Sequence, residues 1–459
     1  MNKHERLKIY NRVPRTYSSK GTTLGSNSEI YEDIVSELEE RAGDAEEVHL
    51  ALYLFNNMEL YRRLLNCANR GARVIVISIP LAGYDRRKIV EAKQVYAQIL
   101  QDKKVELRIF PHMYIWYGAE YAGGGASYSF HIKAGLIRYK DKSSKAFLTS
   151  ANLAPGDPTH SETAVFLEAS NASPVIQMFK KFFDEVERRA KPFAEYNKII
   201  QGLQQGLHQV FDFSFVAGIN RVDFSREQVS QALFTAPFIT IEGNGSNHYA
   251  RELLVKTILS AKQRLLVCTQ HFHDILPFNN YHGNTIVHAI TELKKINPHV
   301  DARVLKQVGS SGLADKRRAA FVESHLYYAG VPQKVNKLVH DKFVIADDIL
   351  IVSSGNFTAT QFAYGRRQME YKVDTNNLNE VQKLIDFVQK YFAIPEGYVS
   401  ARKIRSRKRA PKVKIIKSDI FSEVNGFMVI VDAEAASQVA EYFDRLWNHN
   451  LSMDIEVPK

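Results

Sequence analysis

Apolar side chains recur with two alternating periods along residues 25–110. Three segments have the three- and four-residue spacing of an amphipathic helix: 28–42, 58–72 and 92–104. Three short apolar runs indicate buried strands: 47–55, 73–81 and 105–110. Alternation of helix and strand is typical of an α/β fold with a largely parallel sheet.

The same order of elements returns after residue 245. Helical spacing and strand-like runs alternate again in four segments: 248–263, 264–272, 285–296 and 301–308. Each copy then ends in a His-x-Lys strand, a Ser-x-Asn strand, a strand with a glutamate, and a closing helix, which we place at 175–190 and at 380–392. We therefore predict two pseudo-symmetric α/β/α halves packed around a shared site.

The expected division of the chain follows from this repeat. It has four parts: an N-terminal half at 1–200, a connecting segment at 201–246, a C-terminal half at 247–395, and a basic segment with a small C-terminal appendage at 396–459.

Length and composition agree with a globular protein of two halves. The chain has 459 residues, of which 45% are hydrophobic and 24% charged. No apolar run approaches the roughly 18 residues of a membrane helix, and the N-terminus lacks the apolar core of a secretory signal, so we expect a cytoplasmic protein. Cys67 and Cys268 lie in separate apolar runs, which favours two core residues over a disulfide or a cysteine metal site.

The charge balance narrows the partners. A net charge of +11 and a pI near 9.3 favour polyanions, which include nucleic acids, anionic membrane surfaces and phosphorylated small molecules. Residues 401–417 contain nine Lys or Arg and no acid, so they form either a solvated surface or a polyanion-binding arm.

Polar residues two apart on the closing strands of each copy form the candidate site. Residues i and i+2 of a strand project from the same face, so each His-x-Lys pair shares a surface, and so does each Ser-x-Asn pair. The residues are His131, Lys133, Ser150 and Asn152 in the first copy and His340, Lys342, Ser354 and Asn356 in the second. Two such halves face to face offer paired imidazoles, ammonium groups and amides, which suit a phosphate.

These residue types match the needs of phosphodiester cleavage. One neutral histidine can attack phosphorus while a protonated histidine supplies the acid for the leaving oxygen. Lysines and asparagines can neutralise and hold the non-bridging oxygens. Because the lysines supply positive charge, we expect no metal and no cofactor.

The second copy, His340-x-Lys342 followed by Asp347 and SSGN, resembles the HxKxxxxD and GSxN signature of the phospholipase D superfamily. The resemblance spans residues 25–395 and includes nuclease-like and phosphatidylserine-synthase-like branches. It implies a phosphohistidine intermediate without a metal ion. It also implies that His131 is the nucleophile and His340 the acid.

The resemblance assigns further roles. Lys133, Lys342, Asn152 and Asn356 would grip the phosphate, and an acidic residue on the next strand would orient each histidine. The sequence offers Glu162 and Glu370 for this purpose. The remaining candidates for substrate contact are Ser150, Ser354, Arg366 and Arg367.

The first copy departs from the signature. Arg138 stands where the aspartate is expected, and Asp141 in the following hairpin is a candidate substitute. Two other segments lie near the predicted cleft. Residues 110–130 are rich in aromatics and glycine, suited either to stacking or to packing. His271 and His273 of HFHD, with His282, are expected to line the cleft end of a strand rather than to bind a metal.

Three functions remain open. The first is a nuclease or nucleic-acid end-processing enzyme, which the basic charge favours. The second is a phospholipid phosphodiesterase or phosphatidyltransferase, which would act at a membrane surface. The third is a nucleic-acid-binding protein without activity. A basic nuclease without an obvious recognition domain can depend on a protein partner for targeting.

Overall fold

The computed structural model describes most of the chain, and every statement below concerns these residues. They are 5–14, 29–81, 88–110, 114–117, 121–124, 130–155, 160–204, 222–224, 232–236, 238–274, 285–307, 313–362, 368–372, 379, 399–400, 412–416 and 423–455.

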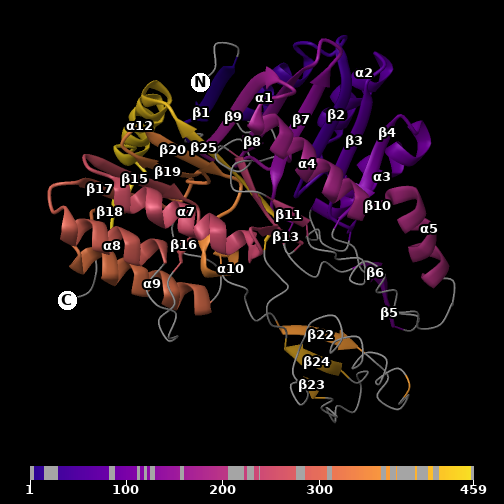
Figure 1. Ribbon diagram of the computed structural model, residues 1–459. Helices are drawn as coiled ribbons and strands as arrows, with labels where there is room; N and C mark the ends of the chain where they lie inside the picture. The colour runs from indigo at the N-terminus through magenta and orange to yellow at the C-terminus, as the bar shows by residue number, and fades with distance from the viewer. Residues whose placement is uncertain are drawn as a thin grey trace.

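Two eight-stranded sheets form the body of the molecule, one in each half (Figure 1). The strands of the N-terminal sheet are, in spatial order, β1 (Arg6–Arg12), β9 (Glu162–Ser170), β8 (Ser143–Thr149), β7 (Lys133–Tyr139), β2 (Ala45–Leu52), β3 (Arg73–Ser78), β4 (Val105–Ile109) and β10 (Lys191–Pro192). Those of the C-terminal sheet are β12 (Ala232–Thr235), β25 (Asn425–Val431), β20 (Ile349–Ser353), β19 (Lys342–Ala346), β15 (Arg264–Thr269), β17 (Asp301–Lys306), β18 (Gln333–Val335) and β26 (Met453–Asp454).

The predicted α/β fold of two pseudo-symmetric halves is confirmed, but the sheets are mixed rather than largely parallel. Strands β2, β3 and β4 are parallel, as are β15, β17 and β18. The hairpins β7–β8 and β19–β20 run antiparallel to them. The sequence periodicity identifies strands but not their directions, because short hairpins need no crossover helix.

Helices pack on these sheets through apolar faces. Their bounds are α1 (Glu29–Glu39), α2 (Met58–Asn69), α3 (Lys88–Asp102), α4 (Pro174–Arg189), α5 (Phe193–Gln204), α7 (Ser246–Ser260), α8 (Ile286–Ile296), α9 (Leu313–Tyr328), α10 (Ala359–Phe362) and α12 (Ala433–Trp447). Helix α2 is representative, since Leu60, Leu64 and Cys67 are buried on one face and Asn57 caps its first turn. No helix in the described part of the chain is long and apolar enough to cross a membrane.

The C-terminal residues complete the second half, so the predicted appendage at 396–459 is wrong for residues 423–455. Strand β25 pairs with β20 along Ser353 to Ile349, and α12 follows it. The run Gly426–Val431 is continuously apolar, which suits a strand covered on both faces. The closing helix expected at 380–392 lies outside the described residues.

The segment predicted as the third strand of the second half lies elsewhere. Strand β22 (Gln368–Lys372) pairs with β24 (Lys412–Ile416), which also pairs with β23 (Val399–Ser400). These three strands form a separate small sheet, drawn apart from both eight-stranded sheets in Figure 1. The alternating polar and apolar residues of β22 suit such a sheet better than a buried central position.

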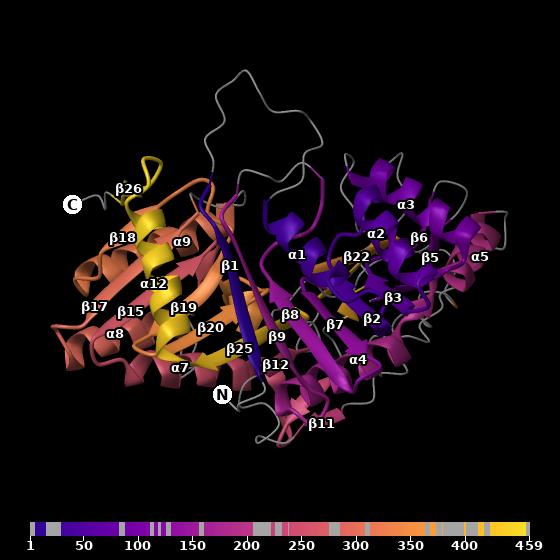
Figure 2. The same cartoon turned by 90° about the horizontal axis from the view of Figure 1, so that it is seen from above.

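The halves meet through backbone contacts that the pseudo-symmetry repeats. Phe130 forms an isolated bridge with Val424, and Val339 forms the equivalent bridge with Ser161. On the outer side, α12 lies along β1 in Figure 2, where the Gln438 side chain donates to the Ile9 carbonyl at 3.2 Å. The smaller paired strands are β5 (Tyr114–Tyr117) with β6 (Tyr121–Gly124), β11 (Val222–Phe224) with β13 (Ile239–Ile241), β13 also with β14 (Asn244–Gly245), and β16 (Phe272–His273) with β21 (Phe357–Thr358).

Candidate active site

The two His-x-Lys pairs lie at the N-terminal ends of equivalent strands in the two halves. Lys133 begins β7 and Lys342 begins β19, and each follows its histidine by two positions. Both lysine side chains are fully buried. Lys133 Nζ donates to the His131 carbonyl at 2.8 Å, and Lys342 Nζ donates to the His340 carbonyl. The chain therefore bends identically in both halves and holds each ammonium group beside its histidine.

The four residues belong to one site. Lys133 Nζ lies 3.2 Å from His131 Nδ1 and 3.3 Å from Nε2. The pKa of His131 lies well below its usual value because of burial and, after it, the charges of Lys133, Lys342 and His340. Burial also places the pKa of Lys133 well below its usual value, and Lys342 lowers it further. Residues of both halves are thus within electrostatic reach of one another.

Glu162 holds a histidine of the opposite half. It begins β9 and is almost fully buried, and its Oε1 lies 2.7 Å from His340 Nδ1. Its second oxygen accepts a hydrogen bond from the Ser150 hydroxyl, which in turn accepts one from the Thr163 N–H at 3.0 Å. A carboxylate that accepts from Nδ1–H leaves Nε2 to face the reaction. The expected role of Glu162 as an orienting acid therefore has the required contact.

Asn425 occupies the equivalent position in the second half. Thr149 pairs with Ala164, and Ser353 pairs with Phe427, so two residues earlier Glu162 corresponds to Asn425. The Ser354 hydroxyl donates to Asn425 Oδ1 at 3.1 Å, as the Ser150 hydroxyl does to Glu162.

Glu370 does not take this position. It lies on β22, opposite Lys414 of β24, and β22 is not a neighbour of β20. The expectation that Glu370 follows the Ser-x-Asn strand in the same sheet is therefore wrong, because β25 fills that edge. Arg366 and Arg367 lie outside the described residues.

His131 has a different partner from His340. Its Nδ1 lies 3.2 Å from the Ser354 carbonyl oxygen, and its backbone N–H donates to the Val424 carbonyl at 3.1 Å. A carbonyl can only accept, so it favours a proton on His131 Nδ1 and a lone pair on Nε2.

The two asparagines follow the serines at the ends of β8 and β20. Asn356 is nearly buried, and its Oδ1 accepts from the His271 N–H at 3.3 Å. Asn152 is half-buried, and its Oδ1 has no hydrogen-bond partner among the described residues. The oxygen contact at Asn356 fixes the direction of the amide, so its NH2 group points away from the His271 N–H.

Three side chains beside the site were not identified from the sequence as site residues. The Tyr53 ring lies 5.3 Å from the His131 ring, and its centroid is 5.6 Å from Lys133 Nζ. The His160 ring lies 5.7 Å from the His340 ring. Glu423 helps to raise the pKa of Lys133 against the larger effects of burial and Lys342. The signal for Glu423 was Ser-Glu before an apolar run, which repeats Ser161–Glu162.

The cleft position of the HFHD histidines stays a prediction. The backbone N–H of His271 contacts Asn356, and His273 lies on β16. His282 lies outside the described residues, as do residues 111–113, 118–120 and 125–129 of the aromatic segment, whose residues 114–117 and 121–124 form β5 and β6. Among the residues that the structure describes, no group of His, Cys, Asp and Glu has the arrangement of a metal site.

The signature aspartate has a structural place. Asp347 follows β19 with a φ of 52°, and its carboxylate accepts the backbone N–H groups of Lys262, Gln263 and Arg264 at 2.7–2.9 Å. In the first half, Arg138 instead pairs with Glu47 at 2.8 Å.

Asp141 replaces this anchor only in part. It pairs with Arg41 at 2.6 Å and accepts the Ser143 N–H at 3.0 Å. The turn is therefore held by a side-chain ion pair rather than by three backbone groups.

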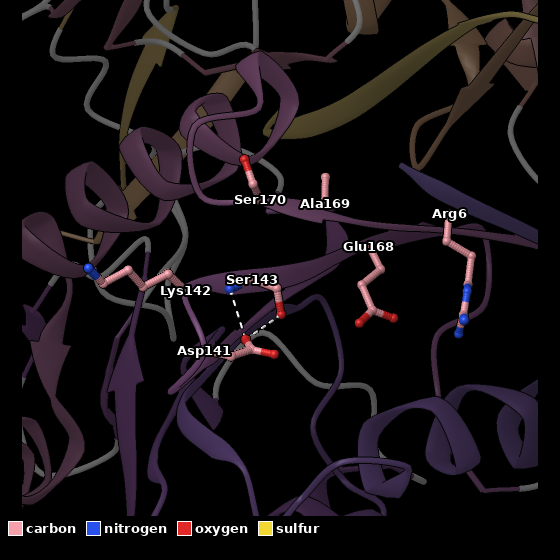
Figure 3. Close-up of a pocket in the computed structure, with 7 residues that line it drawn as sticks. All are labelled: Arg6, Asp141, Lys142, Ser143, Glu168, Ala169 and Ser170. Atoms are coloured by element: carbon pink, nitrogen blue, oxygen red, sulfur yellow. Dashed lines mark hydrogen bonds between the residues drawn. The ribbon is translucent and has the colours of Figure 1, made fainter. Parts of the chain in front are cut away.

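A surface pocket of about 320 Å³ lies beside this turn and is not the candidate site. Figure 3 shows Asp141 and Ser143 joined by hydrogen bonds, with Glu168 and Arg6 on its other side. The turn follows the far end of β7, six residues beyond Lys133, or about 20 Å at 3.3 Å per residue.

Comparison with protein families gives one match. Residues 254–394 match the family described as cardiolipin synthase, PLD-like domain. This range contains the second His-x-Lys and Ser-x-Asn pairs. A search of curated proteins finds no significant match.

Several solved structures resemble the chain. Polyphosphate kinase from Porphyromonas gingivalis matches with a TM-score of 0.47 and 10% identity over 97% of this chain and 51% of the kinase, so this chain spans about half of that protein. Phosphatidylserine synthase from Haemophilus influenzae matches with 0.45 and 10% over 99% and 88%. A mutant yeast tyrosyl-DNA phosphodiesterase matches with 0.42 and 12% over 78% and 84%.

None of these three similarities carries a functional argument. The family match bears on identity because residues 254–394 include the second His-x-Lys and Ser-x-Asn pairs. The second half therefore resembles a PLD-like domain, and the first half repeats its His-x-Lys and Ser-x-Asn pairs.

Proposed function

We propose that the chain is a metal-independent phosphodiesterase that forms a phosphohistidine on His131. The carrying observation is that the two histidines have unequal partners. His340 contacts the Glu162 carboxylate, whereas His131 contacts a carbonyl oxygen and stands beside Lys133. A carboxylate stabilises an imidazolium, and a neighbouring ammonium group opposes one. The pair is thus supplied with one base and one acid.

In the first step, the lone pair of His131 Nε2 attacks phosphorus. The bond from phosphorus to the leaving oxygen breaks, and that oxygen takes the proton from His340 Nε2. Lys133 and Lys342 neutralise charge on the non-bridging oxygens, and Asn152 and Asn356 donate to them.

In the second step, the oxygen of a water molecule attacks the phosphohistidine. The now neutral His340 takes the water proton, and the bond between phosphorus and His131 Nε2 breaks. The products are a phosphomonoester and an alcohol, and both histidines regain their starting protonation states. Replacing water with a second alcohol would give transfer instead of hydrolysis.

We place nucleic acid first as the substrate. The net charge of +11 favours a polyanionic backbone. The Tyr53 ring beside His131 offers an aromatic face on which a base next to the reacting phosphate can stack. In nucleic-acid cleavage or end processing, the positive charge would bind the phosphate backbone and the Tyr53 ring would stack on a base.

A phospholipid substrate is the second candidate. The observation in its favour is the family match over residues 254–394, whose description names cardiolipin synthase. The same histidines would then transfer a phosphatidyl group to water or to another alcohol.

One panel of substrates separates these proposals. The protein is incubated in EDTA with single- and double-stranded DNA, RNA, and vesicles containing phosphatidylglycerol, beside His131→Ala and His340→Ala. We expect cleavage of nucleic acid in EDTA and its loss in both variants. Turnover of lipid alone would move the same residues to the second candidate. A strict need for added magnesium would contradict the histidine mechanism.

A further inference from the structure

The two halves share a backbone arrangement around the histidines but differ in the group behind them. The serine at the end of β8 contacts a carboxylate, that of Glu162, whereas the serine at the end of β20 contacts an amide, that of Asn425. Glu162 and Asn425 occupy equivalent positions by strand register. The site is therefore symmetric in shape and unequal in charge.

The Asn425 amide is locked in one orientation by a buried neighbour. Its Nδ2 donates to Gln361 Oε1, and both side chains are fully buried. Gln361 Nε2 in turn lies 3.4 Å from the Thr235 hydroxyl. With its NH2 group directed to Gln361, Asn425 presents its oxygen to the Ser354 hydroxyl.

Ser354 connects the oriented Asn425 amide to His131, the proposed nucleophile. Its hydroxyl accepts the Gly426 N–H at 3.0 Å, and its own N–H donates to the Gly426 carbonyl at 3.1 Å. These bonds and the one to Asn425 fix the peptide whose carbonyl faces His131 Nδ1.

Close packing maintains the arrangement at Gly355. A Cβ at this position would lie 2.5 Å from both Asn425 Cγ and Gln361 Oε1. Only glycine leaves the amides in contact, since such distances are far inside van der Waals contact.

We propose that Asn425 and Gln361 are positioning residues whose neutral amides, in place of a carboxylate, assign His131 the role of base and nucleophile. This inference rests on the proposed phosphodiesterase function. It adds a physical reason why His131 acts as the nucleophile and His340 as the acid. A carboxylate at 425 would place a negative charge behind Ser354, on the side of the peptide that faces His131, and both histidines would then favour the protonated state.

Other charged groups around the pair bear on the test. Those acting on His131 are Lys133, Lys342 and His340. Glu423 Oε2 lies 3.3 Å from Asn425 Nδ2. His340 faces Glu162 and His160. All of them remain in the variants described next, so a shift on substitution reports the new carboxylate.

The test follows individual histidines by NMR in protein labelled with 13C-histidine, assigned by single His→Gln changes. In the wild-type protein we expect His131 to lose its proton at a lower pH than His340. In Asn425→Asp we expect the His131 midpoint to rise by roughly one pH unit, the lower end of the effect of a nearby opposite charge because Ser354 lies between the two side chains, with His340 nearly unchanged. The acidic limb of the pH–rate profile should rise with it.

Two further variants strengthen this design. Gln361→Glu keeps the acceptor for Asn425 and places a carboxylate one residue farther away, so a smaller rise of the same sign is expected. Asn450→Asp adds the same charge at an exposed site and should change neither midpoint. Asn425→Asp also crowds Glu423, and circular dichroism will show whether it folds.

Equal or reversed midpoints of the two histidines in the wild-type protein would overturn the inference. So would an unchanged His131 midpoint in folded Asn425→Asp or, if that variant does not fold, in Gln361→Glu. Failure of the proposed function looks different: the wild-type protein would cleave no phosphodiester although its histidines titrate apart.

Discussion

Asp347 shows at the scale of one residue why a signature position need not be catalytic. Burial acts to raise the pKa of its carboxyl, but the three backbone N–H groups that it accepts outweigh this and lower the pKa. Its contribution to stability is therefore present above the unfolded-state pKa of about 3.9. It is lost as the pH falls through the lower folded-state pKa.

We expect Asp347→Asn to lower the free energy of unfolding by about 1–3 kcal/mol at pH 7, since one charged acceptor of three N–H groups is removed. Asparagine tolerates the positive φ, so the change isolates the charge. Urea unfolding measures the effect, with the exposed neighbour Asp348→Asn as control. Loss of turnover in the folded variant would contradict a purely structural role.

For Glu162, unlike Asp347, we expect substitution to change the catalytic rate rather than the free energy of unfolding. In Glu162→Gln the His340 imidazolium loses its carboxylate, so the basic limb of the pH–rate profile should move to lower pH. At pH 7.5 the rate should fall by roughly 10²-fold, within the range typical of impaired acid catalysis. Cleavage of a fluorescently labelled oligonucleotide, whose alcohol leaving group needs the acid, measures both. Glu168→Gln lies on the same strand but pairs with Arg41, and it should leave the profile in place.

The repeat in the sequence predicts most of the candidate site. Spacing predicts His131, Lys133, His340 and Lys342, and the structure places each lysine against the carbonyl of its own histidine. Asn425 and Gln361 were not found because an amide in an apolar run carries no signal of its own. Asn425 is recognised only from the strand register, which gives it the position in the second half that Glu162 has in the first.

At the scale of elements, the largest error concerned the end of the second half. Both β22 and β25 follow β20 in the chain and both carry strand-like patterns, and proximity in the sequence favours β22 as its neighbour. The structure uses β25, since its continuous apolar run fills a buried edge. Periodicity identified the strands, but nothing in it says how far along the chain a partner strand lies.

Helix α12 links this region to the site. The Tyr442 hydroxyl lies 2.8 Å from the Arg12 carbonyl and 2.9 Å from Asp341 Oδ2, and Thr163 donates to the other Asp341 oxygen at 2.5 Å. Asp341 is fully buried between His340 and Lys342 in the sequence, and burial raises its pKa to about 6. Its effect favours folding at low pH and declines as the pH rises from about 3.9 to the folded-state value.

This geometry predicts a pH-dependent cost for Tyr442→Phe. Loss of the hydroxyl should lower the free energy of unfolding by about 1–3 kcal/mol. The loss should be larger at pH 8 than at pH 5, since the ionised Asp341 depends more on donors. Urea unfolding at both values measures it, with the exposed Tyr328→Phe as control. An equal cost at the two pH values would show that Asp341 does not titrate as described.

At the scale of the whole molecule, charge and catalysis can be separated. The net charge of +11 predicts that DNA affinity falls steeply with salt, linearly in a plot of log affinity against log salt concentration. Replacing Arg402, Lys403 and Arg405 with glutamine should reduce the slope while leaving hydrolysis of bis(p-nitrophenyl) phosphate unchanged. Fluorescence anisotropy measures the first and nitrophenolate release the second. An unaltered slope would assign that segment no part in DNA binding.

The proposed phosphohistidine mechanism depends on both halves of the molecule. Each half supplies one histidine, and Glu162 of the first half contacts His340 of the second. The most direct test is to trap the covalent intermediate. His340→Ala is mixed with thymidine 5′-(p-nitrophenyl phosphate), whose leaving group needs no acid, and is quenched in alkali, where phosphohistidine survives. We predict a stoichiometric burst of nitrophenolate and a peptide in which His131 carries the thymidine 5′-phosphoryl group. Label on another residue, or turnover by His131→Ala, would contradict the account.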